Sequence, residues 1–239
     1  MFGTRSTLRI KKQNLPLKAP VILPCLALGL SLFIMQASES IISVCFNSSL
    51  LKYGGDIAVG AMTILTSVMQ FAMLPLQGVG QGSQPIISYN YGAKNVDRVK
   101  SAFKLLLKVS LTYSVFLWLC VMIFPQVFAG MFTSDATLLA FTAKALRIYL
   151  ACLFMFGIQI ACQMTFTSIG RAKASIIVAV MRKFILLIPL IYIMPAILHR
   201  NQTMAVYMAE PIADFLAVTF TAVLFFFEFR KALRELFVK

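Results

Sequence analysis

The feature that most constrains this chain is a series of six long apolar runs joined by short polar connections. The first four cover about residues 20–51, 57–89, 105–128 and 136–169, the fifth follows the turn at residue 170, and the sixth follows the segment HRNQ at 199–202. Each run is long enough to cross the hydrocarbon core of a bilayer as a helix, which takes about 20 residues. Because lipid offers no hydrogen-bond partners to the backbone, such runs form helices. We therefore predict an all-α integral membrane protein with six transmembrane helices.

The composition agrees with a membrane protein and argues against a nucleic-acid partner. Of the 239 residues, 60% are hydrophobic and only 13% are charged, whereas soluble domains carry about a quarter charged residues. The net charge of +14 would suit a nucleic-acid binder, but the basic residues are clustered between apolar runs. Such clustering is typical of membrane proteins whose basic loops face the cytoplasm.

The basic residues also predict the orientation of the chain. With the N-terminus inside, 18 of the 22 Lys and Arg residues lie on the inner side: five before residue 19, five at 94–108, four at 171–183 and four at 230–239. The other four are Lys52, Lys144, Arg147 and Arg200. Since cytoplasmic loops carry the excess of Lys and Arg, we expect a multi-pass protein of the plasma membrane with both termini in the cytoplasm.

The same pattern divides the chain into three parts. Residues 1–18 form a basic cytoplasmic arm, residues 19–229 a six-helix transmembrane lobe, and residues 230–239 a basic cytoplasmic tail. The five cysteines lie in or beside apolar runs without a CxxC pair, and His199 is the one histidine. Metal and nucleophilic sites need clustered ligands or a paired base, so we expect neither a metal site nor an enzyme.

Several polar residues lie inside the apolar runs and are candidates for a transport cavity. Four glutamines, Gln70, Gln77, Gln81 and Gln84, recur at intervals of three, four or seven and share one face of a helix. This stripe lines a cavity or bonds helices together, and both interpretations stay open. The other cavity candidates are Gln36, Tyr89, Asn90, Gln159 and Gln163.

Three acidic residues in the runs are candidates for cation or proton coupling. Glu39 lies in the middle of the first run, where a charge is costly unless it faces a cavity or a partner. Glu210 and Asp214 are four residues apart and share a helix face. They bind a cation or share a proton, or else they cap a helix at a wet outer boundary. Arg182 and Lys183, two turns into the fifth run, are interpreted as structural anchors for lipid headgroups.

The segment at 78–100, GVGQGSQPIISYNYGAKNVDRVK, is the richest in glycine and proline. Its motif residues are Gly78, Gly82, Pro85 and Gly92. Glycine permits close approach of other groups and proline frees backbone carbonyls. We expect Pro75 and Pro85 to kink or interrupt the second helix. A kinked packing helix and a helix that lines a cavity are both consistent with this segment.

Four stretches carry a family resemblance. Residues 84–100 read QPIISYNYGAKNVDRVK and closely resemble a signature of bacterial MATE (multidrug and toxic-compound extrusion) transporters. YGGD at 53–56, TSIGRAKASIIVAVMRKFILLIPLIYIMP at 167–195 and VYMAEPIADFLA at 206–217 resemble the family in the same order. The match extends from about Leu15 onward and corresponds to one half of the family's fold. The resemblance implies a C-terminal six-helix lobe, with residues 1–18 as the connector between lobes.

The resemblance also implies a function. A lobe of this kind belongs to a multidrug efflux antiporter that exports amphipathic organic cations in exchange for protons or sodium ions, with no other cofactor. Exporters of the family often carry an acidic residue in the helix that corresponds to the first run, which favours Glu39 as the coupling residue. In some members the helix at 136–169 carries another acid, which this chain lacks after Asp135.

The implied partners are membrane lipid, small organic cations, and either a missing N-terminal lobe or a second copy of the chain. Two other functions stay open. One is a flippase for lipid-linked sugars from the same wider superfamily. The other is a truncated or non-transporting membrane partner protein, because alternating access needs two bodies that move about a site.

Overall fold

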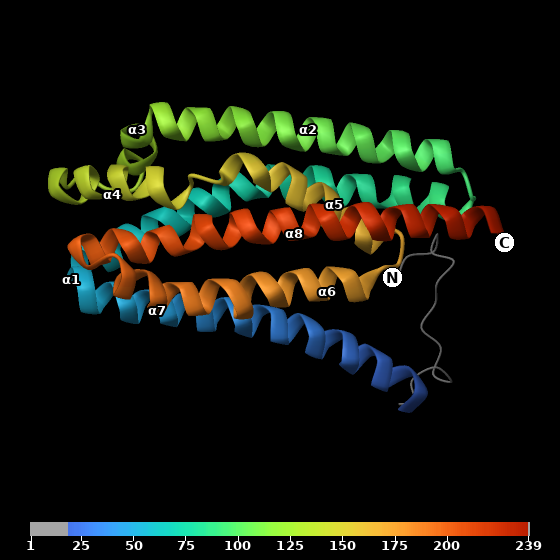
Figure 1. Cartoon of the computed structure of the whole chain (residues 1–239), viewed down its shortest axis with the longest axis horizontal. Coiled ribbons are helices and arrows are strands. Elements are labelled where there is room, and N and C mark those ends of the chain that lie inside the picture. Colours follow the sequence, from blue (N-terminus) through green and yellow to red (C-terminus); the bar gives the residue numbers. More distant parts are fainter. Residues whose placement is uncertain (1–18, 239) are drawn as a thin grey trace, which may run out of the picture. The chain divides into compact units, whose positions relative to one another are not determined.

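The computed structural model describes the backbone of residues 19–238 and the side chains of residues 37–171 and 174–235. All regular elements in this range are helices, which confirms the predicted all-α membrane fold. They are α1 (Ala19–Gly92), α2 (Val96–Ile123), α3 (Pro125–Gly130), α4 (Ala136–Tyr149), η2 (Leu153–Met155), α5 (Phe156–Ser168), α6 (Ala172–Val180), η3 (Met181–Leu187), α7 (Ile188–Ile197), η4 (His199–Asn201) and α8 (Gln202–Val238) (Figure 1). The chain forms two units, Met1–Ser43 and Val44–Lys239, and each is described by itself.

The long element α1 consists of two helices that meet at Gly55. Gly55 has φ 62° and ψ −160°, a conformation that is open almost only to glycine. The apolar part of α1, Ala37–Gly92, contains 56 residues, and as one straight helix it would be about 84 Å long. This is more than twice the roughly 30 Å thickness of a bilayer core. The reversal at Gly55 divides this length into two passes.

The start of α8 packs tightly against this reversal. The Thr203 hydroxyl donates a hydrogen bond to the Tyr53 carbonyl (2.8 Å), and the Tyr207 hydroxyl donates one to the Ala58 carbonyl (2.7 Å). A Cβ atom on Gly54 would lie 2.5 Å from Cγ2 of Thr203, which is closer than carbon atoms pack. Glycine at this position therefore lets α8 approach the turn.

The number of passes agrees with the six that the sequence predicts. In the described part of the chain, Ala37–Gly92, Val96–Ile123, Ala174–Ile197 and His199–Glu235 are long and apolar enough to span a membrane. The helices Ala136–Tyr149 and Leu153–Ser168 pass the same test as a pair and are bent by 44° at the break between them. Counting this pair as one span and Ala37–Gly92 as two passes brings the total to six.

Two expectations about single helices are corrected. We expected Pro75 and Pro85 to kink or interrupt the second helix, and α1 is not interrupted there, since it stays helical through both prolines. The run at 136–169 is not one helix, because α4 ends at Tyr149 and a 3-10 turn precedes α5. The indole N–H of Trp118, on α2, donates to the Ala151 carbonyl within this break (2.8 Å). A neighbouring helix thus satisfies a backbone group that the bend frees.

The helices α2 and α5 cross at very short range. A Cβ atom on Gly157 would lie 2.6 Å from both the carbonyl carbon and the carbonyl oxygen of Ser110. Glycine therefore lets the two backbones touch, as small residues do where membrane helices cross. This contact holds the second part of the broken span against α2.

Most of the basic side chains of the Val44–Lys239 unit gather at one end of it. The start of α2, the connection from α5 to α6 and the last turns of α8 lie together there, and we call this the basic end (Figure 1). Arg171 fastens the α5–α6 connection to α8 through Glu235 (2.7 Å) and Glu228 (3.7 Å). The hydrogen bond to Glu235 raises the pKa of Arg171. Gly55, α3 and the α7–α8 connection lie at the opposite end.

Candidate functional site

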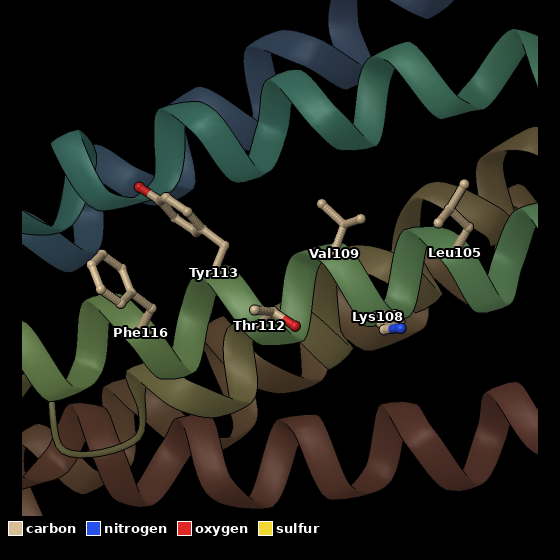
Figure 2. A pocket seen from close by; sticks show the side chains of 6 residues that line it. All are labelled: Leu105, Lys108, Val109, Thr112, Tyr113 and Phe116. Carbon is tan, nitrogen blue, oxygen red and sulfur yellow. The ribbon is translucent and has the colours of Figure 1, made fainter.

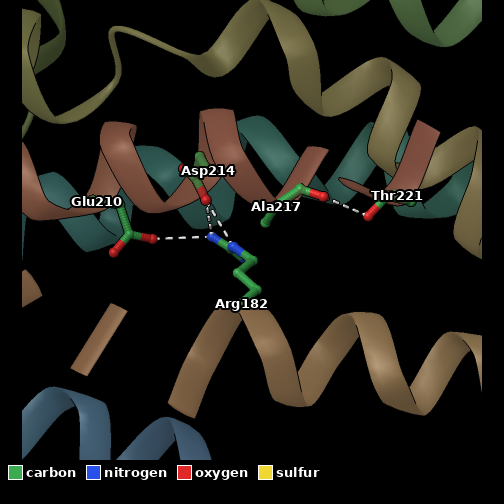
Figure 3. Close-up of polar contacts among 5 residues, drawn as sticks. All are labelled: Arg182, Glu210, Asp214, Ala217 and Thr221. Atoms are coloured by element: carbon green, nitrogen blue, oxygen red, sulfur yellow. Dashed lines mark hydrogen bonds and ion pairs between the residues drawn. The ribbon is translucent and has the colours of Figure 1, made fainter. Parts of the chain in front are cut away.

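A buried group of three charged residues lies inside the Val44–Lys239 unit, and we call it the ion triad (Figure 3). Nη2 of Arg182 lies 3.0 Å from Oε1 of Glu210 and 2.6 Å from Oδ1 of Asp214. Nε of Arg182 donates to the same Asp214 oxygen at 2.7 Å. Glu210 is 5% exposed and Asp214 is 2% exposed. Both carboxylates are therefore held by one guanidinium and are removed from the surface of the unit.

The triad lies far from both ends of the helices that supply it. Arg182 comes eight residues after Ala174, the first residue of its span, which is about 12 Å of helix. Asp214 comes twelve residues after Gln202, the first residue of α8, which is about 18 Å. A charged side chain this far inside a transmembrane helix is costly, and such residues usually belong to a functional site.

Both helical segments that supply the triad have irregular backbone at this level. Arg182 belongs to η3, a stretch of π-helix between α6 and α7. Pro211 interrupts the hydrogen bonding of α8 between the two carboxylates. π-Helical turns and broken membrane helices are common at functional sites, since they free backbone groups and let a helix change shape.

Aromatic side chains complete the surroundings of the guanidinium. Arg182 lies over the ring of Phe156, with its central carbon 5.4 Å from the ring centroid. The ring of Tyr149, at the end of α4, meets that of Phe46 edge to face at 6.3 Å. The Thr221 hydroxyl, also drawn in Figure 3, bonds within α8 to the Ala217 carbonyl (2.7 Å) and belongs to the next turns of the helix.

The triad contains two acidic groups and one basic group. One guanidinium meets two carboxylates, and arginine stays protonated in proteins. Two carboxylates that share one buried cation are coupled, so the charge state of either one affects the other. Ionisable groups inside a membrane protein often mark the path of a proton or an ion.

The geometry corrects two interpretations of these residues. Glu210 and Asp214 do not cap a helix at a wet boundary, because α8 begins at Gln202 and both side chains are buried. Arg182 does not anchor a lipid headgroup, because its guanidinium contacts these two carboxylates. The sequence placed the two acids on one helix face, but it carried no signal that joined them to an arginine 28 residues away.

Glu39 belongs to the other unit, Met1–Ser43. It is exposed on α1, next to the buried Ser38. It stays a candidate for coupling, and unlike the two carboxylates of the ion triad it is exposed. The side chain of Gln36 lies outside the described residues.

The glutamine stripe lies mostly on the surface of the second half of α1. Gln70, Gln77 and Gln81 are exposed, and the Gln84 amide contacts the sulfur of Met164 at 3.0 Å. Tyr89 is 76% exposed. The motif residues Gly78, Gly82, Pro85 and Gly92 lie on the same helix, and a Cβ atom on any of the three glycines would meet nothing within 4 Å.

Two of the remaining cavity candidates lie inside the unit. Asn90 is buried and donates to the Ile86 carbonyl (2.8 Å), and Gln159 is buried on α5. Gln163, on the same helix, is half-buried. The structure therefore leaves most of the stripe and Tyr89 exposed, while Asn90 and Gln159 help to build the interior.

A hollow of about 440 Å³ runs along α2, away from the triad (Figure 2). Its lining residues are Leu105, Lys108, Val109, Thr112, Tyr113 and Phe116. In the view of Figure 2, Tyr113 points toward the second half of α1, and Lys108 points away from it. Because one helix supplies the whole lining, this hollow is a furrow on the surface and lacks convergent polar groups.

Comparison with known proteins identifies the family. The MatE family matches residues 31–193. The multidrug export protein MepA of Staphylococcus aureus strain N315 is 25% identical over 170 residues, which is 71% of this chain and 37% of MepA. The chain thus spans well under half the length of this curated relative.

Solved structures agree on the fold. An inward-facing multidrug resistance MATE family transporter of the MOP superfamily superposes with a TM-score of 0.82 at 19% identity, over 99% of this chain and 53% of that one. The MATE multidrug transporter DinF-BH, solved as a ligand complex, gives a TM-score of 0.75 at 34% identity, over 92% of this chain and 49% of that one. Because the family match covers more than half of its residues, the chain belongs to the MATE family of multi-pass membrane transporters.

Proposed function

We propose that the chain forms one lobe of a multidrug efflux antiporter that exports amphipathic organic cations in exchange for protons or sodium ions. The observation that carries this proposal is the ion triad, in which two buried carboxylates share one guanidinium. An antiporter needs a place inside the membrane that gains and loses a small cation, and a buried pair of carboxylates that share one guanidinium suits that task. The names of MepA, a multidrug export protein, and DinF-BH, a multidrug transporter, support the substrate class.

The triad links η3 to α8, and both segments have irregular backbone at this level. A proton or Na⁺ on Asp214 or Glu210 weakens the attraction for Arg182 and so loosens η3 from α8. The π-helical turn of η3 and the missing N–H of Pro211 let each helix bend at this level. Cation binding then shifts the balance between two packings of these helices, because it stabilises one of them more than the other.

Glu39 serves the substrate in this proposal. It is an exposed carboxylate on α1, and a carboxylate attracts organic cations. Protonation of Glu39 removes the attraction and releases the substrate. The exposed Gln70, Gln77, Gln81 and Tyr89 offer hydrogen bonds and an aromatic face to the same class of molecule.

A complementary lobe completes the transporter. We infer it from the coverage of the solved transporters, of which the chain spans 53% and 49% in the two comparisons above. Either the other half of a longer protein or a second copy of this chain supplies that lobe. We also propose that the protein lies in the plasma membrane with its basic end in the cytoplasm, in keeping with the excess of Lys and Arg there.

The experiment is gradient-driven efflux of a fluorescent organic cation from proteoliposomes that hold the chain together with its complementary lobe. We expect Asp214→Asn to abolish the response of efflux to the proton or sodium gradient, and Glu39→Gln to slow efflux of the dye. Glu228→Gln is the matched control, since this carboxylate lies on the same helix as Asp214 but at the basic end. If both variants export the dye at the rate of the control, with the same gradient dependence, the antiport proposal is wrong.

A further inference from the structure

A polar hollow of about 370 Å³ lies at the end of the Val44–Lys239 unit opposite the basic end. It is formed by the end of α2, the short helix α3 and α4, which lie together in Figure 1. The polar side chains that line it are Gln126, Lys144 and Arg147, and no acidic side chain lines it in the described part of the chain. The hollow therefore holds two positive charges with no opposite charge in its wall.

Arg147 is held in place by the end of α2. Its Nε–H donates to the Met122 carbonyl at 3.2 Å, and this carbonyl is one of the last four of α2, which lack partners within the helix. The bond orients the guanidinium and leaves its terminal NH₂ groups to donate elsewhere. Lys144 lies three residues earlier on α4, so the two cations share one face of that helix.

The acidic residue at the start of α4 binds backbone N–H groups of its own helix. Asp135 is the N-cap residue of α4, and its Oδ1 accepts hydrogen bonds from the backbone N–H groups of Thr137 (2.7 Å) and Leu138 (3.2 Å). It lies nine residues before Lys144, about 13 Å along the helix. The charge of the two cations is thus not cancelled by their own helix.

The rim of the hollow is apolar and exposed. Phe124 is 58% exposed, Val127 is 61% exposed, and both also line the hollow. Met131 and Phe132, just after α3, are 68% and 48% exposed. Large apolar side chains beside paired cations form a surface that is suited to the boundary between headgroups and acyl chains.

We propose that this hollow binds the phosphate group of an anionic phospholipid in the adjacent leaflet. The terminal NH₂ groups of Arg147 donate to one non-bridging phosphate oxygen, and the Lys144 ammonium donates to the other. The first acyl carbons of the lipid lie on Phe124 and Val127. The two unbalanced cations select a lipid with net negative charge, and the apolar rim selects a lipid over free phosphate.

The test is native mass spectrometry of the purified chain, titrated in detergent with phosphatidylglycerol, phosphatidylcholine or inorganic phosphate. We expect phosphatidylglycerol to bind in preference to phosphatidylcholine. Lys144→Gln and Arg147→Gln should each weaken phosphatidylglycerol binding about fivefold, the value of one Lys or Arg near an anionic lipid surface. Arg200→Gln is the matched control, because Arg200 is an exposed cation in the α7–α8 connection at the same end.

A conservative variant separates recognition from folding. Arg147→Lys keeps the charge but cannot make the Nε bond to Met122, and we expect it to keep its preference for phosphatidylglycerol while the glutamine variant loses it. The proposal is overturned if the two glutamine variants bind phosphatidylglycerol as the Arg200→Gln control does. It is also overturned if phosphatidylcholine binds equally well, or if millimolar inorganic phosphate displaces the lipid and so reveals a site for free phosphate.

Discussion

Loss of Arg182 should destabilise the lobe strongly, because its guanidinium lies within 3.0 Å of both Glu210 and Asp214. In Arg182→Met the two carboxylates, 5% and 2% exposed, lose their counterion and repel one another. Removal of one partner from a buried ion pair costs about 3–5 kcal/mol. Since the methionine side chain replaces most of the buried methylene groups, this cost comes mainly from charge and little from an empty cavity.

The triple variant Arg182→Met, Glu210→Gln, Asp214→Asn isolates that electrostatic cost. All three charges are then absent, so the cost of leaving buried charges without a counterion is removed. We expect the triple variant to recover most of the stability that the single variant loses. Non-additivity of this kind is the signature of residues that act as one network.

Unfolding by SDS in mixed micelles, followed by the fluorescence of Trp118, the only tryptophan of the chain, measures these differences. Arg98→Met is the matched control, because Arg98 is exposed and surface substitutions usually change stability by no more than about 0.5 kcal/mol. The reasoning is refuted if Arg182→Met unfolds at the same SDS fraction as the control. It is equally refuted if the triple variant is as unstable as the single one.

Three further predictions concern packing and hydrogen bonding, with unfolding in SDS as the measurement. Gly157→Ala should cost about 1–3 kcal/mol because its methyl group meets the Ser110 backbone at 2.6 Å. Gly78→Ala is the control and should be neutral or stabilising, since nothing lies within 4 Å of the new atom. Equal effects of the two substitutions would argue against the close crossing of α2 and α5. Tyr207→Phe should cost about 1 kcal/mol through loss of the 2.7 Å bond to Ala58, and an unchanged midpoint would show that this bond contributes nothing. Asp135→Ala should cost about 1 kcal/mol as the N-cap of α4, while Asp135→Asn should keep most of the stability; a large loss in both would point to the charge and not to the cap.

The sequence alone determined the class of fold, the number of passes and the family. Each of the six apolar runs must satisfy its backbone hydrogen bonds within lipid, and a bundle of helices is the structure that does so. The turn at Gly55 and the motif around Pro85 could also be located, since both depend on residue types that are close together in the chain. The pairing of Glu210 with Asp214 on one face followed from helical periodicity.

The tertiary structure decided what those residues do. Arg182 reaches the two acids only because the fifth and sixth spans pack side by side, and no local pattern encodes which helices are neighbours. The break after Tyr149 is also a tertiary feature: nothing in the run at 136–169 marks it, and Trp118 from another helix satisfies the Ala151 carbonyl. Propensity predicted a kink or an interruption at Pro75 and Pro85, and the structure shows that α1 is not interrupted there. The positions of the helices follow from local propensity. Where the helices bend, and which residues pair with the buried charges, depends on contacts between residues that are distant in the sequence.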